Sequence, residues 1–203
     1  MRLPKVVAVV GFKKVGKTKV VEALVKELTN RGCRVGTLKH TSRDYVLDSS
    51  SKDTWRHSAA GSVASAVLTP KKAAIFINHR VVASSAISKL GRVDIVVIEG
   101  FKSLNFVPRI IVARNIEDVE SLANGLEIAI VSSSPARVSN NKASVFLFEN
   151  VAGLADIVEA RSFSFLSGKD CGLCGYPKCR DLARAILAGT AKPEQCEVKK
   201  NDC

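Results

Sequence analysis

Four cysteines near the carboxyl end of the chain have a spacing suited to metal chemistry. The stretch CGLCGYPKC, residues 171–179, holds Cys171, Cys174 and Cys179, and Cys196 follows after a predicted helix, RDLARAILAG. Three thiolates from one glycine-rich turn and a fourth from beyond a helix can wrap a cubane iron–sulfur cluster. Four thiolates can also hold a tetrahedral zinc ion, but zinc ribbons normally pair two C-x2-C knuckles. The single knuckle here favours a [4Fe-4S] cluster over zinc.

The remaining two cysteines differ from this group. Cys33, in the turn after the first predicted helix, and Cys203 have no ligand spacing, so both are interpreted as ordinary thiols. Gly172 and Gly175 keep side-chain carbon away from a cluster and leave backbone N–H groups free to bond its sulfurs. Clustered cysteines in a reducing compartment bind metal more often than they form disulfides, so the pattern agrees with a cytoplasmic chain.

A second stretch with chemical meaning is GFKKVGKT, which runs from Gly11 to Thr18 and matches the phosphate-loop pattern G-x-x-x-x-G-K-[ST]. It lies between a predicted strand and a predicted helix, as the pattern requires. Such a loop turns its backbone N–H groups toward phosphate oxygens, and the positive end of the helix points at the same charge. Gly11 and Gly16 permit the tight turns. Lys17 is expected to reach the β- and γ-phosphates, and the Thr18 hydroxyl to bind Mg²⁺.

A phosphate loop needs a second carboxylate near its metal ion, usually at the end of a neighbouring apolar strand. The stretch DIVVIEG, residues 94–100, offers Glu99 directly after its apolar run. Asp94 begins the same strand and would therefore lie at the opposite end. Glu99 is thus the predicted partner of Thr18 in a magnesium site. No general base is evident beside the loop, so no catalytic residue is predicted.

Strand-like and helical patterns alternate through the chain. The predicted strands cover residues 6–10, 34–40, 62–70, 73–78, 94–100, 108–114, 126–132 and 144–148. The predicted helices cover residues 19–32, 56–61, 81–91 and 150–163. Continuously apolar strands separated by helices indicate a parallel sheet covered on both faces. The predicted fold is therefore α/β, a P-loop NTPase with a mostly parallel sheet flanked by helices, plus a small C-terminal iron–sulfur domain.

The composition limits the class of partner. No apolar run is long enough for a signal sequence or for a membrane span, which needs about 20 residues. The formal net charge is +12, and from residue 166 onward seven Lys and Arg face five Asp and Glu, so most of the excess belongs to the larger part of the chain. This field favours anionic partners such as nucleotides. The basic residues are not interleaved with aromatic ones and no nucleic-acid-binding signature is present, so nucleic acid is not an expected partner.

Four blocks of the sequence, in order, carry a resemblance to a known family. GFKKVGKT, VGTLKH, SSKDTWRHSAAG and DIVVIEGFK, the last followed by PRIIV, look like the molybdopterin-guanine dinucleotide biosynthesis protein B (MobB) family over about residues 4–132. The resemblance implies a GTP-binding, weakly hydrolysing, homodimeric accessory protein. Such a protein assists the transferase that attaches GMP to molybdopterin. The implied partners are GTP, the molybdopterin guanylyltransferase and molybdopterin-bearing proteins.

The same resemblance assigns roles to individual residues. The implied nucleotide-binding set is Gly11, Lys13, Lys14, Val15, Gly16, Lys17, Thr18 and Lys19. The implied pterin or phosphate contacts are Lys39, His40, Arg56, His57 and Lys102. After the strand IAIV, however, the chain has three serines, residues 132–134, where family members show a serine-aspartate pair suited to the guanine edge. Serine cannot accept both hydrogen bonds that guanine donates, so a preference for GTP over ATP comes from the resemblance alone.

Residues 168–198 carry a second resemblance, through the core C-G-x-C-G-x-x-x-C and its downstream cysteine. They look like the small four-cysteine [4Fe-4S] domain of electron-transport complex B subunits and corrinoid iron–sulfur proteins. The predicted organisation is a GTP-binding domain at 1–160, a linker at 161–170 and a cluster domain at 171–203.

Two other functions stay open, a nucleotide-dependent iron–sulfur or metal carrier and a nucleotide-gated redox module. Carrier ATPases usually place a lysine directly after the first glycine of the loop. Phe12 stands there in this chain, which argues against the carrier.

Overall fold

The structure, a computed structural model, describes residues 3–43, 45–138 and 143–196. It divides into two compact units, and each is described by itself. The first unit holds the chain up to His40 together with the chain from Leu90 onward, and the second holds Thr41–Lys89. Within the described residues, no helix combines the length and the apolar character needed to cross a membrane.

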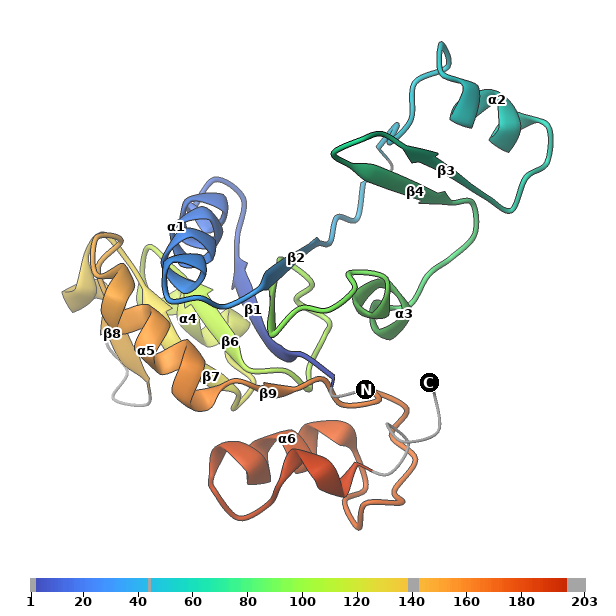
Figure 1. Ribbon diagram of the computed structural model, residues 1–203. Coiled ribbons are helices and arrows are strands. Elements are labelled where there is room, and N and C mark those ends of the chain that lie inside the picture. Colours follow the sequence, from blue (N-terminus) through green and yellow to red (C-terminus); the bar gives the residue numbers. More distant parts are fainter. Residues whose placement is uncertain (1–2, 44, 139–142, 197–203) are drawn as a thin grey trace. The chain divides into compact units, whose positions relative to one another are not determined.

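The first unit is built on a seven-stranded sheet (Figure 1). Its strands are β1 (Lys5–Gly11), β2 (Val35–Lys39), β5 (Ile95–Glu99), β6 (Arg109–Val112), β7 (Glu127–Val131), β8 (Ser144–Phe146) and β9 (Phe163–Ser164). Their order is β2-β5-β1-β6-β7-β8, with parallel pairing throughout this path, and β9 pairs antiparallel with β1. The prediction of a mostly parallel α/β sheet is confirmed.

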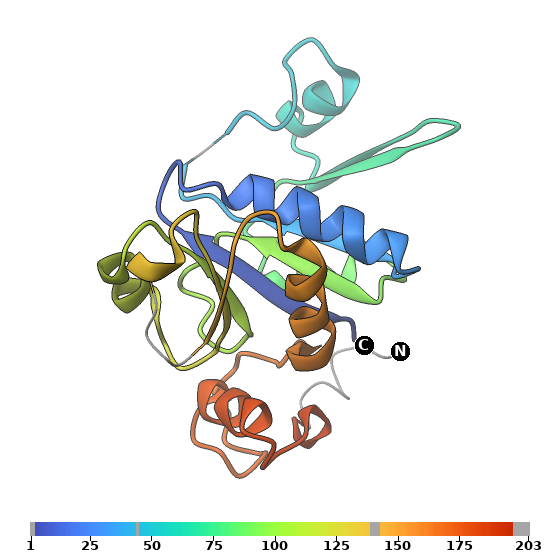
Figure 2. The same ribbon diagram turned by 90° about the vertical axis from the view of Figure 1, so that its left-hand side faces the viewer.

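Helices cover the two faces of this sheet. α1 (Lys17–Asn30) and α5 (Val151–Arg161) pack on one face, where they share a hydrophobic core with Val7 and Val9 of β1 (Figure 2). Alternate residues of a strand point to opposite faces, so the neighbouring residues of β1 face the other way. There the short helix α4 (Ile116–Leu122) contacts β1 and β6. The first unit therefore has the helix–sheet–helix layering expected of its sequence pattern.

The connection between β5 and β6 is a long segment without regular structure, residues 100–108. Its side chains Leu104 and Val107 are buried. Arg109, the first residue of β6, is also buried and donates to the carbonyl oxygens of Leu122 (2.9 Å) and Leu104 (3.0 Å). Because a buried guanidinium needs acceptors for its N–H groups, these bonds hold the connection against the end of α4.

The second unit is small and contains a hairpin of its own. Its elements are α2 (Asp53–Ala59), β3 (Ala64–Leu68), β4 (Ala73–Ile77) and α3 (Ala83–Ser88). β3 and β4 form a separate two-stranded antiparallel sheet. The strands predicted at 62–70 and 73–78 are thus real, but they do not join the parallel sheet. The four residues between β3 and β4 leave room only for an antiparallel turn, in which Thr69 N–H donates to Lys72 O at 2.8 Å.

The end of the chain packs onto the first unit. The segment predicted as a linker, residues 161–170, includes β9 and the buried side chains Phe165 and Leu166. Leu166 belongs to one hydrophobic cluster with Leu126, next to β7, and with Leu182 of α6 (Cys179–Leu187). The cysteine-bearing region therefore shares apolar contacts with the residues that precede β7.

Candidate functional site

The phosphate-loop stretch lies where β1 ends and α1 begins. Gly11 closes β1, and a Cβ added there would lie 2.6 Å from the carbonyl oxygen of Val112, so only glycine fits. Gly16, directly before α1, has a φ of 97°, and Lys14 has a φ of 60°. This left-handed region suits glycine and is rare for other residues. The loop therefore makes the tight turns that its sequence predicts.

Lys17 begins α1, and its ammonium folds back onto the loop. Its Nζ donates to the carbonyl oxygen of Phe12 at 2.6 Å. Burial lowers the pKa of Lys17, and the negative charge of Glu99 acts in the opposite direction. Lys102 and Lys39 lower the same pKa further by repulsion. An anion bound in the loop would offset both effects, because an opposite charge nearby stabilises the charged ammonium.

Thr18 and Glu99 meet at the loop. Thr18 Oγ1 donates to Glu99 Oε1 at 3.0 Å. The strand order explains the meeting, because β5 lies beside β1 and Glu99 is in register with Val9, just before the loop. The side chain of Glu99 is 14% exposed, so it lies at the edge of the core. The two oxygens predicted for Mg²⁺ are thus adjacent, and their role as ligands stays a prediction.

Two further lysines concentrate positive charge beside the loop. Lys39, at the end of β2, places Nζ 3.2 Å from Glu99 Oε1. Lys102 places Nζ 3.9 Å from the centroid of the Phe12 ring, which is a cation–π contact. The carboxyl ends of β2, β5 and β1 lie side by side, so they gather these charges at one edge of the sheet. That edge suits a ligand with several negative charges.

The other residues predicted to bind the nucleotide have different surroundings. Lys13 is exposed, whereas Val15 packs against the hydrophobic core. Lys19 places Nζ 5.3 Å from the centroid of the Phe148 ring. The same ring crowds Gly16, where an added Cβ would lie 2.9 Å from Phe148 Cε1. Phe148, which follows β8, therefore packs against the end of the loop and the start of α1.

His40 follows β2 and stacks on an aromatic ring. Its ring centroid lies 4.0 Å from that of Phe101, with an angle of 13° between the planes. Phe101 has a φ of 61°, and Gly100 before it has a φ of 84°. An added Cβ at Gly100 would lie 3.0 Å from the His40 carbonyl oxygen, so the glycine permits this close approach. The backbone of His40 thus lies beside Glu99, whose carbonyl oxygen accepts from the His40 N–H at 3.0 Å, and the imidazole stacks on Phe101.

Arg56 and His57 lie on α2 of the second unit. Arg56 NH1 is 3.8 Å from Asp53 Oδ1, and both side chains are largely exposed. His57 is exposed as well. Their predicted contact with phosphate or pterin stays a prediction.

The position predicted to meet the base is the turn after β7. Ser132 is fully buried, and its N–H donates to the carbonyl oxygen of Phe146 at 3.0 Å. Its Oγ accepts from the N–H of Ser134 at 3.1 Å. The Ser132 hydroxyl therefore stabilises the turn.

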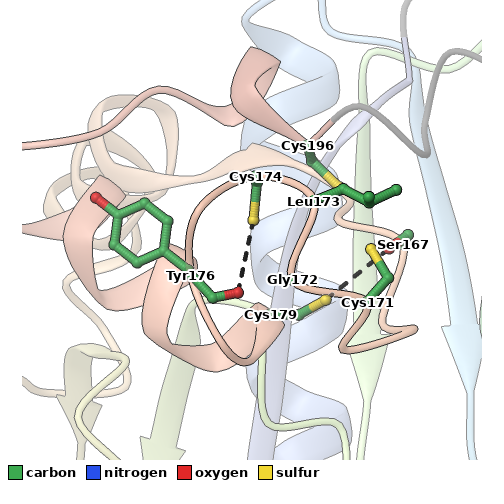
Figure 3. A pocket seen from close by; sticks show the side chains of 8 residues that line it. All are labelled: Ser167, Cys171, Gly172, Leu173, Cys174, Tyr176, Cys179 and Cys196. Carbon is green, nitrogen blue, oxygen red and sulfur yellow. Dashed lines mark hydrogen bonds between the residues drawn. The ribbon is translucent and has the colours of Figure 1, made fainter.

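The four predicted cluster cysteines line one pocket, together with Ser167, Gly172, Leu173 and Tyr176. Figure 3 shows the four thiols directed toward the space that the loop encloses. Cys179, the first residue of α6, and Cys196 are buried, whereas Cys171 is exposed. The four cysteines that the spacing selects thus line one pocket, and their role as ligands stays a prediction.

The same pocket tests which metal group the cysteines fit. In the part of the chain that the structure describes, no group of three or more His, Cys, Asp or Glu is placed to hold a single metal ion. A tetrahedral zinc site needs all four sulfurs about 2.3 Å from one point. Four thiols around one pocket are also the donor set of a cubane cluster, so the chemistry of the lining fits such a cluster. Cys203, interpreted as an ordinary thiol, lies outside the described residues, and Cys33 lies away from the pocket lining.

Comparison with known proteins assigns the larger part of the chain. Residues 6–133 match the family model described as molybdopterin guanine dinucleotide synthesis protein B, MobB. The chain belongs to the MobB family. The resemblance read from the four sequence blocks is therefore confirmed.

Relatives with a curated description agree with this assignment. A Methanocaldococcus jannaschii protein described as "Putative molybdopterin-guanine dinucleotide biosynthesis adapter protein" is 26% identical over 202 residues, which cover 97% of this chain and 78% of the relative. A Bacillus subtilis protein described as "Probable molybdopterin-guanine dinucleotide biosynthesis adapter protein" is 30% identical over 135 residues, which cover 62% of this chain and 75% of the relative.

Solved MobB structures have the same fold. The crystal structure of Bacillus subtilis MobB matches with a TM-score of 0.66 at 24% identity, covering 78% of this chain and 98% of that one. The MobB homologue from Bacillus stearothermophilus matches with a TM-score of 0.58 at 26% identity, covering 76% of this chain and 98% of that one.

A second family model matches the cysteine-bearing end. Residues 166–198 match the model described as "Putative Fe-S cluster". The match begins just before Ser167 and includes all four pocket cysteines. A C-terminal iron–sulfur domain is therefore fused to the MobB domain, as the cysteine spacing predicts.

Sequence reasoning gave no role to the aromatic residues around the MobB phosphate loop. The carbonyl oxygen of Phe12 accepts a hydrogen bond from Lys17, and Lys102 lies over the Phe12 ring. The Phe101 ring stacks on His40. The two ring contacts, Lys102 with Phe12 and His40 with Phe101, have no spacing signature, because each joins residues far apart in the sequence. The glycine before Phe101 was the one available signal, since it marks a sharp turn after a strand.

Proposed function

We propose that this MobB-family chain is a GTP- and Mg²⁺-binding adapter for the conversion of molybdopterin to its guanine dinucleotide form, with a [4Fe-4S] cluster in its C-terminal domain. The observation that carries the nucleotide part is the 3.0 Å contact between Thr18 and Glu99 beside the loop ammonium of Lys17. It supports a triphosphate held with its metal ion at the end of β1. The names of the relatives support the pathway.

The proposed activity on GTP is at most slow hydrolysis. The side chains gathered at the loop are lysines, a threonine and Glu99, and Glu99 already contacts Thr18 and Lys39. A carboxylate engaged in this way supports metal binding better than proton abstraction from water. The loop therefore fits a switch that responds to bound nucleotide.

The proposed residues of the second site are Cys171, Cys174, Cys179 and Cys196. When bound, a [4Fe-4S] cluster would supply one-electron redox chemistry. The chain would hold it between the glycine-rich turn and the amino end of α6, with Cys196 closing the buried side. Zinc remains the alternative metal, and analysis of bound metal and sulfide separates the two.

The proposed partners are the molybdopterin guanylyltransferase and molybdopterin-bearing proteins, in the cytoplasm. The proposal also includes a homodimer. It divides the chain into a GTP-binding domain at residues 1–160, a linker at 161–170 and a cluster domain at 171–203. Lys39, His40 and Lys102 are the proposed pterin or phosphate contacts in the first unit, and Arg56 and His57 those in the second.

The adapter function predicts an effect on the transferase. Addition of the chain with GTP and Mg²⁺ to a guanylyltransferase reaction on molybdopterin is expected to raise the yield of dinucleotide, and ATP is expected to be a weaker substitute. The yield is measured by chromatography of the released cofactor. A Lys17→Ala variant serves as the matched control, because it lacks the loop ammonium alone. An equal yield with and without the chain would contradict the adapter function.

A second candidate function, a nucleotide-gated redox module, is favoured by the segment 100–108. At its start Lys102 lies over the Phe12 ring of the phosphate loop. At its end the Phe106 ring lies 5.4 Å from that of Phe165, edge to face, and against Gly168, next to the cysteine pocket. One segment therefore touches both sites, which offers a physical route for coupling.

This second candidate predicts that nucleotide changes the cluster. GTP with Mg²⁺ is expected to shift the midpoint potential of the wild-type cluster, because a triphosphate would draw Lys102 off the Phe12 ring. The shift is measured by redox titration under anaerobic conditions. The Lys17→Ala variant should show none. If the potential of the wild-type chain is the same with and without nucleotide, the gated module is wrong and the adapter function is unaffected.

A further inference from the structure

The sulfur of Cys179 is surrounded by a short run of the chain that precedes the glycine-rich turn. This run, residues 167–170, has a left-handed backbone at two positions, with φ of 71° at Gly168 and 48° at Asp170. Left-handed residues of this kind can turn neighbouring N–H groups toward one side, where the groups can surround an anion. Asp170 Oδ1 also accepts from the N–H of Cys179 at 2.7 Å, which fixes the run to the start of α6.

Ser167 adds a side-chain donor to these backbone groups. Its Oγ lies 3.9 Å from Cys179 Sγ, within hydrogen-bond distance for sulfur (Figure 3). The same Oγ accepts from the N–H of Lys169 at 3.4 Å. A metal-bound thiolate has no hydrogen to donate, so in a loaded site the Ser167 hydroxyl would be the donor in this contact.

The start of α6 adds to these contacts. Cys179 is the first residue of this helix, and the amino end of a helix favours negative charge at its sulfur.

The position of the run is imposed by the sheet domain. Phe165 and Leu166, directly before Ser167, are buried. Gly168 lies under the Phe106 ring, where an added Cβ would be 2.5 Å from Phe106 Cζ. The residues on either side of Ser167 are therefore fixed by packing as well as by the Asp170 bond to Cys179.

We infer that residues 167–170 form a hydrogen-bonding cradle for the Cys179 sulfur, and that the Ser167 hydroxyl is a positioning residue that raises the reduction potential of the cluster. The inference rests on the cluster site of the proposed function. Reduction adds one electron from an external reductant, breaks no bond and moves no proton, so the negative charge at the sulfurs grows. Donors to sulfur stabilise that added charge.

The test compares midpoint potentials of the full chain with a reconstituted cluster, titrated anaerobically with dithionite and followed by electron paramagnetic resonance. Ser167→Ala is expected to lower the equilibrium constant for reduction roughly tenfold, which is about 59 mV for one electron. Ser167→Thr keeps the hydroxyl and is expected to restore the wild-type potential. Ser84→Ala, at an exposed serine of α3, is the matched control and should have no effect.

Two results would overturn the inference. One is an Ser167→Ala potential equal to that of the wild type, with iron and sulfide contents equal in both. The other is an equal shift in the alanine and threonine variants, which would show that packing and not the hydroxyl sets the potential. A wild-type chain that binds no iron–sulfur cluster would instead refute the cluster site of the proposed function, and this inference with it.

Discussion

Replacing Lys17 with alanine is expected to abolish tight binding of GTP. The ammonium is the only side-chain group of the loop that bonds the loop's own backbone, at Phe12, among the contacts of the described residues. It is therefore held where the terminal phosphates would lie. Loss of charge-assisted contacts to phosphate should weaken binding at least about 100-fold, which is about 2.7 kcal/mol. Isothermal titration of the purified chain with GTP and Mg²⁺ measures the change.

A matched control for this prediction lies on the same helix. Lys26 is exposed on α1, so Lys26→Ala removes one positive charge without touching the loop. It is expected to change GTP affinity less than about threefold, because an exposed distant charge is screened by salt. Thermal unfolding of both variants shows whether the fold is kept. Undiminished affinity of a folded Lys17→Ala chain would remove the basis for the nucleotide site.

The turn between β1 and α1 was predictable because the residues that make it lie close together in the sequence. Gly11, Gly16, Lys17 and Thr18 lie within eight residues, and each type is demanded by the turn or by the phosphate. Glu99 was predictable for a different reason, since apolar strands of a parallel sheet end at one edge. Asp94 at the other end of that strand is accordingly far from the loop. It pairs there with Arg34, whose hydrogen bonds lower the pKa of Asp94 to about 2.

The elements that sequence reasoning missed or misplaced depend on distant partners. β9 has two residues and exists only because Phe163 pairs with Val6. The helix α4 is short and rich in charge, so it has little apolar periodicity, although Asn115 caps it by accepting from Asp118 N at 3.0 Å. That cap was a readable signal. The strands of the β3–β4 hairpin were predicted to belong to the main sheet, because an apolar run indicates a strand but not the strand with which it pairs.

The grouping of the four pocket cysteines was predictable, but their surroundings were not. Spacing alone identifies four cysteines around one helix. It does not show that Cys196 shares a hydrophobic cluster with Leu126 and Leu166 of the sheet domain. Nor does spacing place Ser167 beside Cys179, since that contact depends on the path of the chain after β9. These are tertiary contacts between residues with no common periodicity.

Replacing both Cys171 and Cys174 with serine is expected to remove the cluster. Both belong to the glycine-rich turn, and neither is fully buried, so the change takes away two ligands with little loss of packing. Two remaining thiolates cannot hold a cubane. Iron and acid-labile sulfide, measured on anaerobically reconstituted chain, should fall from about four of each to near zero.

Cys33→Ser is the control for this loss. Cys33 is half-buried against the core of α1 and α5, outside the cysteine pocket, so its variant should keep the wild-type iron and sulfide. A wild-type chain that instead holds one zinc ion and no sulfide would contradict the cluster.

The two variants also separate metal binding from folding. Cys179 and Cys196 anchor the buried side and remain in the double variant, so α6 should keep its contacts with Leu126 after the cluster is lost. Retained GTP binding in that variant would then show that the phosphate loop folds and binds independently of the cluster.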